Sequence, residues 1–245
     1  MLKKLFVLSA LLLAALTVSV SAQAQIKAVV GLSLPPYIMQ GADNGVDADI
    51  VRAALQAAGY TLKLEYVPFA RVSVSMANKT ADAAFPINQA SGVTGVFYSD
   101  SHISYQNVVV GLTAKGLTVN SVADLKGLRV VAFGEAKSYL GPDFAAMATA
   151  NKTYSEIADQ QSQVKMLFKD RADVVIMDIN IFKYFRQAIK DTDVSAPVTF
   201  FKIFPPTAYN VAFTSKAVCD KFNAGLKTIK SSGKYAEIFK TYIKD

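Results

Sequence analysis

Residues 26–59 read IKAVVGLSLPPYIMQGADNGVDADIVRAALQAAG, and the pattern of this stretch decides the fold. Ile26 to Leu34 is an apolar run of strand length, and Pro35-Pro36 ends it because proline fixes φ and lacks an amide donor. After a turn-forming segment from Gly41 to Gly45, apolar residues recur at helical spacing as far as Gly59. The stretch therefore predicts a buried strand, a turn and a helix.

The same alternation of strands and helices continues along the chain in two blocks. It favours an α/β protein with mostly parallel sheets flanked by helices, and two blocks of about 100 residues favour two lobes rather than one. We expect residues 25–109 and 211–245 to form lobe 1 and residues 110–210 to form lobe 2. The other expected strands are 61–67, 82–87, 108–113, 128–133, 172–177 and 209–214, and the other expected helices are 71–78, 122–125, 162–168, 181–189, 218–229 and 235–242. The strands 108–113 and 209–214 are expected to cross between the lobes, which leaves a cleft between them.

The first 24 residues have the pattern of a secretory signal peptide. Lys3 and Lys4 precede an apolar run from Leu5 to Val20, and Ala22-Gln23-Ala24 supplies small residues for a signal peptidase. A membrane anchor is the alternative, but the run is shorter than the roughly 20 residues of a spanning helix. A lipid anchor would need a Cys after the run, whereas the sole Cys is Cys219. The sequence predicts a soluble periplasmic protein without a lipid anchor.

Composition argues against several classes of function. One Cys and one His are too few for a disulfide framework or for a zinc or haem site, so no metal is expected. The chain has no Gly-rich phosphate loop, and export argues against ATP- or NAD-dependent chemistry, so no cofactor is expected. The formal charge of +7 is moderate and dispersed, which together with export opposes nucleic-acid binding.

The chain carries eight short motifs in order: LPPY (34–37), GVDADI (45–50), VPFAR (67–71), ADAAFP (81–86), YSD (98–100), DLKGLRV (124–130), RADVVIMD (171–178) and GKYAEIF (233–239). Together they resemble the motifs of periplasmic solute-binding proteins of the polar amino-acid type, the receptors of ABC importers. The resemblance covers nearly the whole chain after residue 24. It implies the type II periplasmic-binding-protein fold, in which two α/β lobes joined by two hinge strands enclose a small polar solute.

One segment departs from the family pattern. The family usually has a Thr-x-Glu-Arg segment after the strand that ends here at Pro86, and its Arg clasps the carboxylate of an amino-acid ligand. Residues 88–95 instead read NQASGVTG, without Arg or Lys. Either another cation holds the carboxylate, or the ligand lacks one.

Five residues of lobe 1 are candidates for solute binding. Arg71 follows a Pro-aromatic pair that the resemblance places at the cleft, where its planar guanidinium could replace the missing clasp, although a solvated helix residue is the alternative. Tyr37 and Phe69 follow strand ends and could stack on a solute, or could belong to the core. Phe85 and Asn88 end a strand at the same edge, where Asn88 could form hydrogen bonds, whereas Phe85 fits the core better.

Four residues of lobe 2 are also candidates. Lys137, Ser138 and Tyr139 follow a buried strand that ends at Gly134, where free amides, a hydroxyl and an ammonium could bind an anion. An ordinary surface loop is the alternative. The resemblance implies that Asp178 pairs with the amino group of the ligand, and it could also be the N-cap of the helix that follows.

The leading interpretation is a monomeric receptor that closes around a small polar solute and delivers it to the membrane permease of an ABC importer. A periplasmic lyase or hydrolase on the same fold is one alternative, because cyclohexadienyl dehydratase resembles this family. It would need Glu135, Asp178 or His102 as acid or base. A receptor that signals to a membrane sensor protein is the other. His102 lies between polar residues and is expected to be exposed, and Cys219 is expected to be buried.

Overall fold

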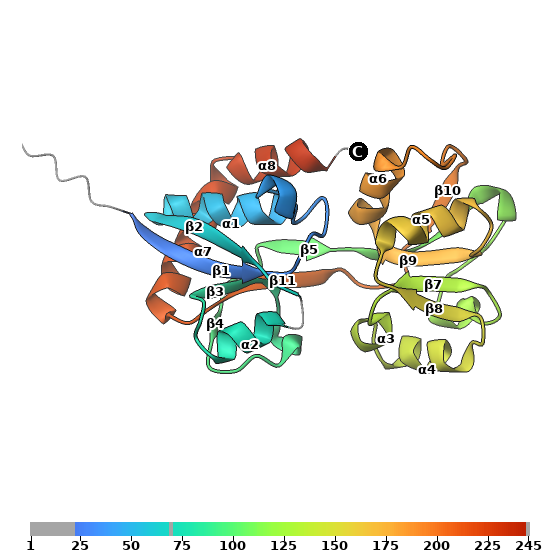
Figure 1. Cartoon of the computed structure of the whole chain (residues 1–245), viewed down its shortest axis with the longest axis horizontal. Helices are drawn as coiled ribbons and strands as arrows, with labels where there is room; N and C mark the ends of the chain where they lie inside the picture. The colour runs from blue at the N-terminus through green and yellow to red at the C-terminus, as the bar shows by residue number, and fades with distance from the viewer. Residues whose placement is uncertain (1–22, 69–70, 244–245) are drawn as a thin grey trace, which may run out of the picture.

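The computed structural model describes residues 23–68 and 71–243 and shows two α/β lobes side by side (Figure 1). The predicted signal peptide lies outside the described residues except for its last two. Each lobe contains one sheet flanked by helices, as expected from the alternating pattern. Within the described ranges, no helix is both long and apolar enough to cross a membrane.

Lobe 1 is built on a six-stranded sheet. Its strands are β1 (Ala24–Val30), β2 (Tyr60–Tyr66), β3 (Ala83–Ile87), β4 (Phe97–Tyr98), β5 (Ile103–Tyr105) and β11 (Thr207–Phe213). The order is β2-β1-β3-β11-β4, with β5 paired to β11. β1 is parallel to β2 and β3, as βαβ connections require, whereas β11 returns from lobe 2 and is antiparallel to its neighbours. The helices of lobe 1 are α1 (Val46–Ala57), α2 (Val72–Ala77), α7 (Lys216–Ser231) and α8 (Lys234–Tyr242), with short 3₁₀ turns at Gln40–Ala42 and Gln89–Ser91.

Lobe 2 repeats this plan with a five-stranded sheet. Its strands are β6 (Asn107–Leu112), β7 (Val130–Phe133), β8 (Tyr154–Ile157), β9 (Val174–Asp178) and β10 (Val198–Phe201). The order is β10-β6-β9-β7-β8, in which β7 is parallel to β8 and β9, and β6 is antiparallel to β9 and β10. The helices of lobe 2 are α3 (Ala136–Tyr139), α4 (Pro142–Ala150), α5 (Gln160–Phe168) and α6 (Ile179–Ala188), with 3₁₀ turns at Thr113–Lys115 and Val122–Leu125.

The chain crosses between the lobes at two places. Gln106 alone separates β5 of lobe 1 from β6 of lobe 2, and residues 202–206 separate β10 from β11. All of β6 pairs within the sheet of lobe 2, and all of β11 pairs within that of lobe 1. The crossings therefore precede the boundaries that the sequence suggested, 109/110 and 210/211, because an apolar run does not reveal which sheet supplies its hydrogen-bond partners.

The strands and helices expected from the sequence are present, with bounds that differ by a few residues. The structure adds elements that the sequence did not indicate, because each has few residues or a weak apolar pattern. These are β4, β5, β8, β10, α3 and α4.

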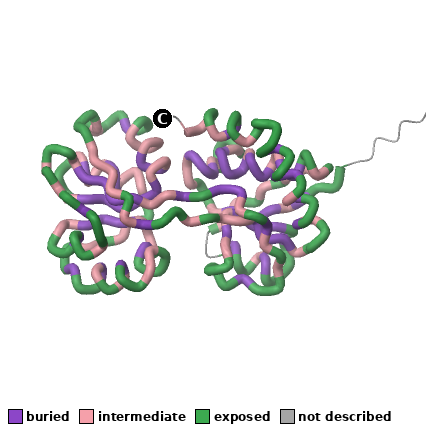
Figure 2. Tube along the Cα trace, turned by 180° about the vertical axis from the view of Figure 1, so that it is seen from behind, coloured by how far each residue is buried: buried purple, intermediate pink, exposed green. Residues whose placement is uncertain are grey.

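The cores lie between the sheets and their helices, and Figure 2 shows buried positions along the strands of both lobes. In lobe 1, α1 packs on α7 so closely that a Cβ added at Gly225 would lie 2.1 Å from the backbone oxygen of Ala54. Only glycine allows this approach of the two helix backbones. Cys219, which is also on α7, is 4% exposed, as expected from the sequence.

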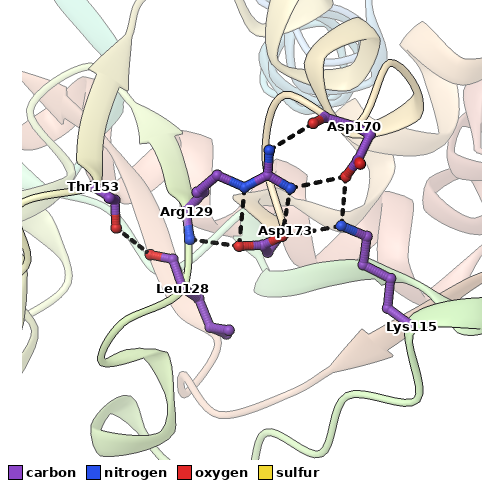
Figure 3. A network of polar contacts seen from close by, with 6 residues as sticks. All are labelled: Lys115, Leu128, Arg129, Thr153, Asp170 and Asp173. Atoms are coloured by element: carbon purple, nitrogen blue, oxygen red, sulfur yellow. Dashed lines mark hydrogen bonds and ion pairs between the residues drawn. The ribbon is translucent and has the colours of Figure 1, made fainter.

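In lobe 2, a cluster of charged side chains links three segments (Figure 3). Arg129, just before β7, donates to Asp173 Oδ1 at 2.7 Å and to Asp170 Oδ1 at 2.8 Å. Lys115 donates to Asp173 Oδ1 at 3.0 Å and to Asp170 Oδ1 at 2.5 Å. Since Asp170 and Asp173 precede β9, the cluster ties the segments around β6, β7 and β9 together.

Candidate functional site

The expected site residues come from both lobes, and most of them lie at or after the carboxyl ends of parallel strands, where open α/β sheets bind ligands. In Figure 1, α2 lies below the sheet of lobe 1, and α3 lies at the edge of lobe 2 nearest to lobe 1. Arg71 is the exposed N-cap residue of α2, and Asn88 is the half-buried residue before the turn at Gln89–Ser91. Phe69 lies outside the described residues.

Two aromatic candidates, Tyr37 and Phe85, lie in the core. Phe85 is 1% exposed and meets the His102 ring edge-on, with ring centroids 6.1 Å apart. Tyr37 has no exposed surface and stacks on Tyr105 at a centroid distance of 3.8 Å. Neither ring presents a face to a solute in this arrangement, because burying such large apolar surfaces stabilises the lobe. Tyr37 and Phe85 therefore both belong to the core, which was the alternative to solute binding for each of them.

Asp178 caps helix α6 and also binds lobe 1. Its Oδ1 accepts hydrogen bonds from the amides of Asn180 at 2.8 Å and Ile181 at 3.1 Å, and from the Tyr37 hydroxyl at 2.9 Å. Its Oδ2 accepts one from the Gln106 amide at 2.8 Å. The Asn180 side chain also donates to the Tyr37 oxygen at 3.0 Å. The carboxylate is thus surrounded by donors of the chain itself.

Burial and these hydrogen-bond donors act in opposite directions on the pKa of Asp178. The side chain is 3% exposed, and burial raises the pKa of its carboxyl group while the hydrogen bonds from Ile181 and Tyr37 oppose the rise. Burial, and then the charge of Asp178, raise the pKa of Tyr37 well above its usual value. Chemically, Asp178 and Tyr37 form a connection between the lobes, and a ligand amine would have to share or displace it.

Two backbone amides of the segment 134–139 bind a carboxylate of the chain. The amide of Glu135 donates to Glu156 Oε2 at 2.7 Å, and that of Lys137 donates to Oε1 at 3.0 Å. The expectation of free amides was therefore wrong for these two, because β8 pairs with β7 and brings Glu156 beside the start of α3. The side chains of Lys137, Ser138 and Tyr139 are exposed, as a binding role would require.

Glu156 is a site residue that the sequence analysis missed. Its Oε1 also accepts from the Tyr154 hydroxyl at 2.7 Å. Burial acts to raise the pKa of Glu156, but the hydrogen bonds from Tyr154 and from the amides of Lys137 and Glu135 outweigh it and lower the pKa. The sequence gives one signal of Glu156: Tyr154 and Glu156 are two residues apart, which is the spacing of side chains on one face of a strand. The strand itself, β8, was not predicted.

Aromatic side chains of β5 and β11 pack against each other and against Tyr37. The Tyr209 ring on β11 lies 4.7 Å from that of Tyr105 on β5, which in turn stacks on Tyr37. Tyr139 on α3 is 52% exposed, and its ring lies 6.5 Å from that of Phe133. Burial raises the pKa of Tyr209 to about 12, and the neighbouring Tyr139 phenol adds to the rise. The sequence did not indicate this stack of Tyr37, Tyr105 and Tyr209, because the alternation within one strand does not show which side chains from other segments will pack on it.

His102 and Asp47 form a buried pair in lobe 1. His102 Nε2 lies 2.5 Å from Asp47 Oδ1, and the Tyr105 hydroxyl donates to Asp47 Oδ2 at 3.1 Å. His102 is 1% exposed, and its Nδ1 has no hydrogen-bond partner among the described residues. The expectation that His102 is exposed was wrong, because α8 packs over it and the Tyr235 hydroxyl donates to its carbonyl at 3.0 Å. In this arrangement the pair has no access to a substrate.

Two hollows lie elsewhere on the surface. A cavity of about 20 Å³, enough for about one water, lies where the lobes meet near α6 and α8, between Pro36, Asn180 and Tyr242. A hollow of about 430 Å³ lies on lobe 1 beside α7, between Asp100 and Lys227. None of the expected site residues lines either hollow.

The fold and the sequence together define a class of protein. The chain matches the model of the bacterial extracellular solute-binding proteins, family 3, over residues 26–245. It therefore belongs to this family, and its two lobes have the type II periplasmic-binding-protein fold.

Solved structures with similar folds are binding proteins of low sequence identity. The GluR0 ligand-binding core in complex with L-glutamate has a TM-score of 0.72 and 17% identity, over 91% of this chain and 100% of its own. An ancestral arginine-binding protein bound to arginine has a TM-score of 0.68 and 18% identity, over 90% and 99%. The arginine-, lysine-, histidine-binding protein ArtJ from Geobacillus stearothermophilus has a TM-score of 0.67 and 19% identity, over 89% and 94%.

Proposed function

We propose that this protein is an exported receptor that binds a small polar solute between its two lobes and delivers it to the membrane permease of an ABC importer. The observation that carries this proposal is that the chain connects two lobes of the solute-binding family by two short crossings, at Gln106 and at residues 202–206. Such connections let one lobe rotate against the other.

Closure would be driven by the solute itself. A ligand that contacts both lobes at once binds the closed form more tightly than the open form and so shifts the population toward closure. The exposed side chains of Arg71 on lobe 1 and of Lys137, Ser138 and Tyr139 on lobe 2 are the groups we assign to these contacts, together with Asn88. We assign Asp178 to the hinge side of the site, where a solute amine would compete with Tyr37.

The solutes bound by proteins of similar fold support a small polar ligand. One of these proteins binds L-glutamate, another arginine, and the third arginine, lysine and histidine. Export through a signal peptide cleaved after Ala24, a periplasmic location and a monomeric state complete the proposal.

The first experiment is thermal unfolding of the protein purified from the periplasm of an expressing bacterium. The panel is L-amino acids, polyamines, dicarboxylates, small peptides and aromatic acids. A solute at 100 times its dissociation constant stabilises the folded state by about 2.7 kcal/mol, which raises the melting temperature by several degrees. Small-angle scattering with the same solute should show a smaller radius of gyration, and mass spectrometry should show a chain that begins at Gln25.

Two other functions make different predictions in the same experiment. An enzyme would return the solute chemically changed, whereas a receptor returns it intact, as mass spectrometry of the released ligand would show. His102 and Asp178 are buried, which leaves Glu135 as the exposed acid among the three candidates. A signalling receptor would bind and close in the same way but would not support solute uptake by a permease in membrane vesicles.

A further inference from the structure

The buried pair of Asp47 and His102 in lobe 1 lies too deep for a solute to touch it in this arrangement. Asp47 has no exposed surface, and His102 is 1% exposed. His102 Nε2 lies 2.5 Å from Asp47 Oδ1 and is the donor, because an ionised carboxylate only accepts hydrogen bonds. A buried pair of ionisable groups returns about as much free energy as its desolvation costs. Stability alone therefore does not account for the pair.

Asp47, in the first turn of α1, fixes two tyrosines. Its Oδ2 accepts the Tyr105 hydroxyl at 3.1 Å, and its backbone amide donates to the carbonyl of Tyr37 at 3.1 Å. The rings of Tyr105 and Tyr37 stack with centroids 3.8 Å apart and planes inclined by 20°. Asp47 thus holds Tyr37 at its backbone and, through Tyr105, at its ring.

The Tyr37 hydroxyl carries these contacts into lobe 2. It donates to Asp178 Oδ1 at 2.9 Å and accepts from the Asn180 side chain at 3.0 Å. Because aromatic pairs prefer particular arrangements, a Tyr105 ring that is held by Asp47 favours one orientation of the Tyr37 ring. A buried polar chain therefore connects the core of lobe 1 to lobe 2, and its members are His102, Asp47, Tyr105, Tyr37 and Asp178.

We propose that Asp47 and His102 are positioning residues of the solute site, because they hold the Tyr105 ring and through it keep the Tyr37 hydroxyl on Asp178, where it competes with a solute amine. This inference rests on the proposed receptor function. Neither member of the pair contacts the solute. The pair instead sets how readily an amine obtains the carboxylate of Asp178.

A positioning role and a purely structural role predict opposite effects on solute affinity. A pair that only stabilises lobe 1 would, when broken, lower the melting temperature and leave solute affinity unchanged or reduced. A pair that keeps the Tyr37 hydroxyl on Asp178 would, when broken, release the carboxylate to the solute and increase the affinity. The two roles are therefore separated by the direction of the change.

The first test detects the buried polar chain without any solute. His102 is the single histidine of the chain, so a protein purified without a histidine tag gives one set of imidazole signals in NMR spectra. Asp178→Asn changes the far end of the buried polar chain and should shift the ring nitrogen signals of His102 at constant pH. Asp191→Asn is the matched control, because it changes an acid of lobe 2 that pairs with Lys165 at the surface. It should leave the signals in place.

The second test measures affinity by isothermal titration calorimetry. The probes are L-arginine, L-lysine and putrescine, together with any solute of the broader panel that stabilises the wild type. Tyr105→Phe removes only the hydroxyl that Asp47 holds, and it should bind a probe at least about threefold more tightly than the wild type does. In a Tyr37→Phe background the same change should have no further effect, because the bond to Asp178 is already absent.

Two variants of His102 and one control complete the comparison. His102→Leu removes the donor to Asp47 and should also increase the affinity. His102→Gln should keep the wild-type affinity, because its amide can donate in place of Nε2. Tyr66→Phe is the matched control, since the Tyr66 hydroxyl donates to Asp43 Oδ1 at 2.9 Å at the surface of lobe 1. It should leave the affinity unchanged. Thermal unfolding without solute establishes that each variant is folded.

Three outcomes overturn the inference. The first is that the His102 signals move no further in Asp178→Asn than in the control. The second is that a folded Tyr105→Phe variant binds the probes no more tightly than the wild type does. The third is an equal gain with and without the Tyr37 hydroxyl. The proposed function survives all three, because the wild type still binds a solute. If no solute of the whole panel binds the wild type, the proposed function and the inference fall together.

Discussion

At the scale of single residues, Asp178 both caps a helix and connects the two lobes. Its Oδ1 accepts three hydrogen bonds, which cap α6 and hold Tyr37 of lobe 1, and its Oδ2 accepts the Gln106 amide at the crossing. Removing an N-cap costs about 0.5–2 kcal/mol, and leaving buried donors without an acceptor costs about 1–3 kcal/mol more.

Asp178→Ala should therefore lower the free energy of unfolding by about 2–4 kcal/mol, as measured by urea denaturation. Asp178→Asn should cost less, because an amide oxygen can keep the three contacts of Oδ1 and only the amide of Gln106 meets an NH₂ group instead of an acceptor. Equal losses in the two variants would show that capping and the Tyr37 contact contribute little.

The contribution of Asp173 to the stability of the fold depends on pH. The hydrogen bond from the Arg129 side chain, followed by those from the Arg129 amide and Lys115, lowers the pKa of Asp173 from its ordinary 3.8, although partial burial opposes this. A carboxyl whose pKa is lower in the folded state stabilises the fold above its unfolded pKa and loses this effect as the pH falls.

Asp173→Asn should thus lower the urea midpoint at pH 7, and the difference from the wild type should shrink as the pH falls below about 4. The control is Asp143→Asn, a change at an exposed acid in the first turn of α4. A difference that stays constant from pH 7 to pH 3 would contradict the ion-pair explanation.

At the scale of elements, the packing of α1 on α7 determines how closely the C-terminal helices pack on the rest of lobe 1. The contact depends on Gly225, because a Cβ there would meet the Ala54 carbonyl at 2.1 Å. The obstacle is backbone, so the helices themselves must separate to accept a side chain.

Gly225→Ala should destabilise the protein by about 1–3 kcal/mol, although alanine is the better helix former, because overpacking of backbone cannot relax by a change of rotamer. Ala224→Ser, at the exposed neighbouring position on α7, should be nearly neutral. Thermal denaturation of both variants gives the comparison, and a stabilised Gly225→Ala would show that the two helices can move apart easily.

At the scale of the whole molecule, the lobes are joined by two crossings and by the contact of Tyr37 with Asp178 and Asn180. The two crossings allow rotation, whereas this contact favours the arrangement of lobes seen here. Its strength therefore influences how readily the lobes move relative to each other.

Tyr37→Phe keeps the ring stacked on Tyr105 but removes the bond between lobes. Nitroxide labels at the exposed positions Asn78 and Lys152, in a Cys219→Ala background, should give a broader distance distribution for Tyr37→Phe than for the parent protein in pulsed electron resonance. Tyr60→Phe, which changes a tyrosine within lobe 1, should leave the distribution unchanged. An unaltered distribution in Tyr37→Phe would mean that the bond does not restrain the lobes.

Much of the fold could be predicted from the sequence, whereas the site could be predicted only in part. Strands such as β9 and helices such as α1 and α7 have long apolar patterns, so their existence followed from periodicity. Asp178 was identified as an N-cap because local chemistry marks that position. Glu156 was not found, because its partners belong to a segment about 20 residues earlier and are brought near only by the pairing of β8 with β7.

The sequence by itself determined the alternation of strands and helices, the division into two lobes and the family to which the chain belongs, because these depend on local periodicity and on the order of motifs. The tertiary structure decided which strand belongs to which sheet, that Tyr37 and Phe85 are buried, and that Glu156 fills the amides at α3. These features depend on contacts between residues far apart in the chain, and a single sequence carries no direct signal of which distant residues come into contact.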